Sequence, residues 1–144
     1  MLSFLIIVVL ALFSSVYGMD TGEETALRRL AATTDILTSY EDELVGEPVS
    51  GMLLMRDTVS IDLSLNSSYI YEIVVWTESS FNFVDFWVTN PSGSVPVSKQ
   101  SDHVSFPVTP YSTESRTWNL QIELLDAANS DTAYYAFALL RRSP

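Results

Sequence analysis

Residues 84–95 read VDFWVTNPSGSV, a strand pattern followed directly by a turn pattern. Its first half alternates the apolar residues Val84, Phe86 and Val88 with a second set, Asp85, Trp87 and Thr89. A period of two predicts a β-strand with one buried face and one face toward solvent. Asn90-Pro91-Ser92-Gly93 then supplies a side-chain acceptor, a fixed φ and a residue that tolerates positive φ. We therefore expect a turn here, followed by the second strand of a hairpin.

The strand pattern continues in both directions from this hairpin. Further strands are expected at 58–65, 69–76, 95–97, 103–108, 117–124 and 133–140. Glu72 marks the outer side of its strand, because an unpaired buried carboxylate is costly. Pro96 and Pro107 indicate that their strands lie at sheet edges or begin near the proline. Seven or eight short strands joined by polar turns predict a mainly β fold, an antiparallel β-sandwich of the jelly-roll or Greek-key kind.

We expect Phe86, Val88, Leu120 and Ile122 to form the core of this sandwich. Each lies on the apolar side of a strand whose other side is polar. Trp118 is in phase with Leu120 and Ile122, so it is also expected in the core. The strand at 133–140 is apolar on both faces and closes the domain.

The N-terminal part of the chain has a different pattern. Residues 2–13 form an apolar run broken only by Ser3, and Val16-Tyr17-Gly18 fits a cleavage site, so residues 1–18 are predicted to be a signal peptide. We expect the mature chain to begin near Met19. An uncleaved membrane anchor over residues 2–17 is the alternative. No residue of the leader is charged, so the net charge of −11 belongs to the mature chain.

An amphipathic helix is expected between the signal peptide and the strands. Thr21 and Glu24 have the spacing of a capping box, and proline at position 48 marks the end of the segment. The apolar stripe runs over Leu27, Leu30, Thr34, Leu37 and Leu44. Threonine and serine lower helix propensity near residues 38–40, where a break is expected. The predicted organisation is a signal peptide at 1–18, a helical leader at 19–46 and a β-sandwich domain at 47–144.

Composition excludes several classes of partner and site. The excess of carboxylates repels phosphate backbones and anionic lipid surfaces, so neither nucleic acid nor, after signal cleavage, a membrane is an expected partner. The absence of cysteine from the sequence excludes disulfides and thiolate zinc sites. The fold must therefore be held by its core. Asn66-Ser67-Ser68 is a glycosylation sequon, which is relevant only in a eukaryotic host.

Several stretches together resemble the bacterial pre-peptidase C-terminal domain. They are Asp62-x-Ser64, 69–75, the stretch 83–93 with its Asn-Pro-Ser-Gly turn, 117–122 and 135–139. The likeness covers about residues 50–141 and leaves the helix unexplained. Two features depart from the family pattern: Glu114-Ser115-Arg116 stands where a glycine is usual, and no protease domain precedes this one. The resemblance implies an extracellular jelly-roll accessory module, with polymer or calcium binding in some members and no catalytic motif.

Trp76 and Trp87 are the candidate ligand-binding residues. Both fall on strand faces interpreted as outer, where two indoles together could form a stacking platform for a sugar ring or a polymer. The alternative is that the helix covers them.

Other candidate sites are less specific. Asp126, Asn129 and Asp131 share one loop and offer the hard oxygen ligands that calcium takes, but a solvated turn is the favoured interpretation. Calcium is the only cofactor that the sequence leaves open. His103, the single histidine, has no nucleophile elbow to accompany it and is interpreted as an edge-strand residue facing water. Asp85 is either a ligand or a strand residue beside Trp87.

The sequence as a whole favours a secreted, extracellular or periplasmic, non-enzymatic accessory or interaction module. Its expected partners are a protein or a neutral polymer. Two alternatives stay open: a secreted hydrolase with an unrecognised site, and a surface protein anchored by its N-terminal segment.

Overall fold

A computed structural model describes residues 21–127 and 130–144, and within them the fold is mainly β. The predicted signal peptide lies outside the described residues. The strands are β1 (Glu43–Leu44), β2 (Val49–Leu54), β3 (Thr58–Ser64), β4 (Ile70–Thr77), β5 (Phe83–Thr89), β6 (Val97–Ser101), β7 (His103–Val108), β8 (Thr117–Asp126) and β9 (Thr132–Arg142). A helix, α2 (Gly22–Thr38), precedes them, and a 3₁₀ turn, η1 (Ser112–Glu114), lies before β8. No helix in these described ranges is long and apolar enough to cross a membrane.

Two antiparallel sheets form the sandwich. One has the order β2-β9-β4-β7, with β1 pairing along the same side of β9 as β2, and the other has the order β3-β8-β5-β6. Each early strand therefore pairs with a late one: β2 with β9, β3 with β8, β4 with β7 and β5 with β6. This nesting is that of a jelly roll, so the predicted fold class is confirmed.

The predicted core residues lie between the two sheets. Phe86, Val88, Leu120 and Ile122 are fully buried. Trp118 is also buried, and its indole Nε1 donates to the carbonyl of Glu114 at 2.8 Å. The strand phases inferred from period-two alternation are thus confirmed for β5 and β8.

The central turn forms as expected. Gly93 adopts φ +85°, its N–H donates to the carbonyl of Asn90 at 3.0 Å, and Asn90 Oδ1 accepts from the amides of Ser92 and Ser94. Glycine takes this positive φ without the steric cost that a Cβ would bring. The returning strand, β6, runs from Val97 to Ser101, so it starts later and extends further than the predicted 95–97.

The helix begins at the predicted capping box, in which Glu24 N–H donates to Thr21 Oγ1 and Thr21 N–H to Glu24 Oε2, both at 3.1 Å. It ends at Thr38, inside the predicted break. The expectation that Leu44 lies on the helical stripe is wrong: Leu44 belongs to β1 and pairs with Leu140 of β9. A short strand forms there because the chain has already turned back along the edge of the sheet.

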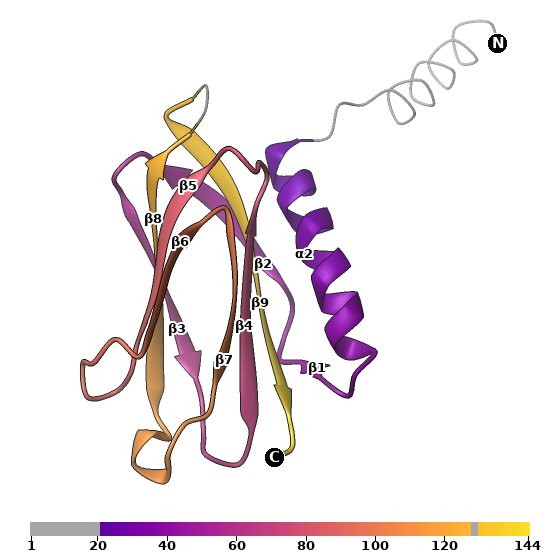
Figure 1. Ribbon diagram of the computed structural model, residues 1–144, viewed down its shortest axis with the longest axis vertical. Helices are drawn as coiled ribbons and strands as arrows, with labels where there is room; N and C mark the ends of the chain where they lie inside the picture. Colours follow the sequence, from indigo (N-terminus) through magenta and orange to yellow (C-terminus); the bar gives the residue numbers. More distant parts are fainter. Residues whose placement is uncertain (1–20, 128–129) are drawn as a thin grey trace, which may run out of the picture.

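The helix covers the outer face of the β2-β9-β4-β7 sheet and makes the molecule three-layered (Figure 1). Ala26 and Leu30 of α2 pack on four residues of β4 and β9, namely Val74, Ala136, Ala138 and Leu140. This contact explains why β9 is apolar on both faces, one toward the sandwich core and one toward the helix. Among the described elements, the outer face of β3-β8-β5-β6 has no such cover.

Candidate functional site: the open sheet face around Trp87

The uncovered face of the second sheet is centred on β5 and β8. Trp87 is half-buried there, and its cross-strand neighbours are Gln121 of β8 and Ser98 of β6. Asp85 lies two residues earlier, opposite Glu123 and Gln100. Directly opposed residues of antiparallel strands share a face, with Cβ atoms about 4.5–5.5 Å apart. An indole therefore lies within a surface of amides, hydroxyls and carboxylates.

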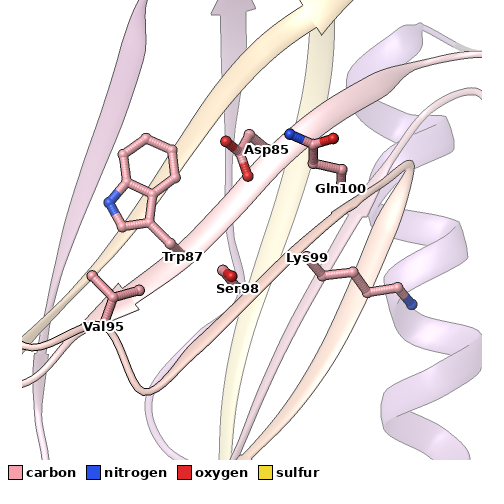
Figure 2. Close-up of a pocket in the computed structure, with 6 residues that line it drawn as sticks. All are labelled: Asp85, Trp87, Val95, Ser98, Lys99 and Gln100. Carbon is pink, nitrogen blue, oxygen red and sulfur yellow. The ribbon is translucent and has the colours of Figure 1, made fainter.

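A shallow depression of about 490 Å³ opens beside this indole. Its lining residues are Asp85, Trp87, Val95, Ser98, Lys99 and Gln100. Figure 2 shows Trp87 next to Val95, Asp85 close to Gln100, and the Lys99 side chain extending away from the indole. Lys99 pairs with the inward-facing Phe86, which places it on the opposite side of the strand from Trp87. The volume lies within the range of about 300–1,000 Å³ that is usual for ligand sites.

Trp87 differs from the other two tryptophans in having no internal partner. Trp118 and Trp76 each donate an indole hydrogen bond, to Glu114 O at 2.8 Å and to Thr33 Oγ1 at 2.9 Å. Within residues 21–127 and 130–144, Trp87 makes no side-chain hydrogen bond, ion pair or ring contact. Its indole is therefore available to a ligand as it stands.

Trp76 lies on the other side of the molecule, so the two indoles do not form one platform. It belongs to β4, in the sheet that α2 covers, and its bond to Thr33 ties it to that helix. The alternative prediction, that the helix covers the tryptophans, therefore holds for Trp76. Trp87 belongs to β5 in the opposite sheet, whose outer face α2 does not cover.

His103 packs against neighbouring side chains, whereas the sequence predicted that it faces water. Its ring stacks on Trp76 with centroids 4.0 Å apart and planes inclined by 6°, and its Nδ1 lies 2.9 Å from Asp102 Oδ1. Arg29 of α2 lies over the same indole at 4.5 Å and forms an ion pair with Asp102 at 2.8 Å. His103 is on the edge strand β7, as expected, but it packs on Trp76 because the register of β4 with β7 sets the two residues directly opposite each other. These contacts fasten the helix to the sheet.

The attachment of α2 to the sheet depends on pH through the Asp102 carboxyl. Burial raises the pKa of this carboxyl, but hydrogen bonds from His103 and Arg29 outweigh burial and hold the pKa below its usual 3.8. A lowered folded-state pKa gives stability that is complete above the unfolded-state pKa and is lost as the pH falls through the folded-state pKa.

We therefore expect Asp102→Asn to cost stability near neutral pH and progressively less below about pH 4, because Asp102 becomes protonated in the parent chain too. Urea unfolding of both chains at pH 3 and pH 6.5 measures this difference. Asp57→Asn, at an exposed position, serves as the matched control for loss of one carboxylate. A destabilisation by Asp102→Asn that is the same at both pH values contradicts this role.

The predicted calcium ligands cannot be assembled into a site. Asp126 ends β8 and Asp131 is exposed just before β9, while Asn129 lies outside the described residues. No group of three His, Cys, Asp or Glu side chains that could hold a metal occurs in the described part of the chain. Calcium at this loop stays a prediction.

Comparison with known proteins places the chain by fold only. No family model matches it, so the resemblance to the pre-peptidase C-terminal domain stays a prediction. No curated protein matches it either. Among solved structures it is similar to the Yersinia pseudotuberculosis-derived mitogen (14% identity, TM-score 0.51, covering 68% of this chain and 85% of that one). It is also similar to Aeromonas hydrophila PliG, a periplasmic inhibitor of g-type lysozyme (12% identity, TM-score 0.50, covering 67% and 85%). These similarities support the small β-sandwich fold.

Proposed function

We propose that this chain is a secreted, non-enzymatic binding module that holds an extracellular protein or neutral polymer on the open face around Trp87. One observation carries the proposal: an indole without an internal partner lies in a depression on the sheet face that α2 leaves uncovered. Aromatic side chains in such surroundings are frequent anchors of binding surfaces.

Two further points support a binding role. The fold is similar to that of PliG, which inhibits a lysozyme, and to that of a mitogen, so similar folds serve as scaffolds for such activities in other proteins. The apolar leader is consistent with export, which would bring the module to extracellular partners.

A hydrolase is the second candidate, and one pair of residues favours it. Asp85 and Glu123 are opposed on adjacent strands beside Trp87, and two neighbouring carboxyl groups are what retaining glycosidases use, about 5–5.5 Å apart. Such an enzyme needs one carboxyl in apolar, water-excluding surroundings. Both residues here are half-buried on an open sheet face, which is why binding is the leading proposal.

Replacing Trp87 tests the binding role directly. We expect Trp87→Ala to keep a cooperative unfolding transition, because its side chain faces outward, and to lose capture of the partner when the secreted full-length chain is immobilised and exposed to the extracellular fluid of its source. Phe81→Ala is the control, since Phe81 is another aromatic residue that is 75% exposed but lies outside the depression.

Equal capture by the parent chain and Trp87→Ala would contradict the proposed face. Release of new reducing ends from an offered polysaccharide, abolished by Asp85→Asn, would favour the hydrolase instead.

A further inference from the structure

The polar side chains around Trp87 indicate the kind of ligand. Within the described ranges, Asp85, Glu123, Gln121 and Gln100 make no hydrogen bond or ion pair through their side chains. On the helix-covered side, by contrast, carboxylates are engaged: Glu72 accepts from Ser105, Glu43 from Arg141 and Asp42 from Arg142. The open face therefore keeps a set of donors and acceptors free around one indole.

Asn119 adds an acceptor that lacks a partner. Its Nδ2 donates to Ser60 Oγ at 2.7 Å and to Asp62 Oδ1 at 2.9 Å, which fixes the amide. Its Oδ1 is buried and has no partner among the described residues. Asn119 pairs with Thr89, two residues from Trp87 on β5 and on the same face. Buried polar atoms are normally satisfied, and this enclosed oxygen becomes an acceptor for a ligand hydroxyl only when a side chain beside it moves.

The charge of the face excludes anionic ligands. The strand positions that share the face of Trp87 include three carboxylates, Asp62, Asp85 and Glu123, and no Lys or Arg in this described sheet. A phosphate, sulfate or uronate group placed there would meet like charge, and Lys99, the cation among the residues that line the depression, extends away from the indole. Ligands rich in neutral hydroxyl groups meet no such penalty.

We infer that this face binds a neutral carbohydrate chain, with Trp87 packing against the apolar C–H face of one sugar ring. Carboxylates accept from sugar hydroxyls, and the amides of Gln121 and Gln100 both donate and accept. The depression is shallow and open, which fits a polymer lying across the strands better than an enclosed small molecule. This inference rests on the proposed binding function and narrows its partner to one chemical class.

Affinity electrophoresis of the secreted full-length chain tests the ligand class. Native gels contain a neutral polysaccharide, namely mixed-linkage β-glucan, galactomannan or dextran, or an anionic one, namely alginate or heparin. We expect at least one neutral polymer to retard the chain and neither anionic polymer to do so. Trp87→Ala should weaken the retarding interaction about tenfold or more, as loss of a central aromatic anchor does. Gln121→Ala should weaken it less, and Phe81→Ala should match the parent chain.

The gels distinguish the chemical class of the ligand from the location of the binding face. Lack of retardation by all three neutral polymers, or equal retardation by an anionic one, overturns the carbohydrate inference. If Trp87-dependent capture of a protein accompanies that result, the binding function stands and its partner is a protein. If retardation by a neutral polymer is unchanged in Trp87→Ala, carbohydrate binds elsewhere and both the inference and the proposed face are wrong.

Discussion

Phe86→Ala is expected to lower the free energy of unfolding by about 3 to 5 kcal/mol, through lost transfer energy and the cavity left behind. Phe86 is fully buried at the centre of β5, between β8 and β6. A domain of this size has a total stability of about 5–15 kcal/mol, so the variant should be partly unfolded at ambient temperature if the parent lies at the lower end. Urea unfolding followed by circular dichroism measures the change.

Phe81→Ala is the matched control for this substitution. It removes the same side chain from the same part of the chain, but Phe81 is 75% exposed. Exposed substitutions away from special features usually change stability by less than about 0.5 kcal/mol. If the two variants unfold at the same urea concentration, the assigned phase of β5 is wrong.

Leu30→Ala should detach the helix selectively. Leu30 is 1% exposed and packs with Ala26 against β4 and β9. Truncating a buried leucine costs about 2–5 kcal/mol. Most of the stability of a protein helix comes from the packing of its apolar face, so the amides of α2 should lose protection from hydrogen exchange more than those of β5 and β8.

Ile36→Ala provides the comparison on the same helix. Ile36 is 60% exposed, and alanine is the better helix former, so exchange in α2 should be unchanged or slower. Exchange in α2 that is unaffected by Leu30→Ala would mean that contacts such as the Arg29–Asp102 ion pair, and not apolar packing, hold the helix.

The sequence predicts best those features that depend on local alternation. The burial of Phe86 and Ile122, the turn at Asn90 and the capping box at Thr21 all follow from spacing and side-chain chemistry within a few residues. The apolar residues on both faces of β9 are likewise visible in the sequence, and the packing of α2 accounts for the outer ones. These features need no knowledge of which strands pair.

Other features depend on pairing between distant segments, which the sequence alone does not predict. The sequence of β2 shows no period-two pattern, because Met52 and Leu54 are apolar although they are exposed on either side of buried Leu53. The separation of Trp76 from Trp87 follows from the assignment of β4 and β5 to different sheets, which alternation does not specify. For the same reason, the opposition of Asp85 and Glu123 becomes visible only in the register of β5 with β8.

The most direct test of the open face is the indole N–H resonance of each tryptophan in the ¹⁵N-labelled chain during titration with mixed-linkage β-glucan, galactomannan or dextran. The indoles of Trp76 and Trp118 are held by Thr33 and Glu114, whereas Trp87 has no partner in the described structure. We expect the Trp87 signal to shift with at least one polymer while the other two stay in place. A shift of Trp76 with Trp87 unmoved, or no shift with any of the three, would contradict binding of a neutral polymer at this face.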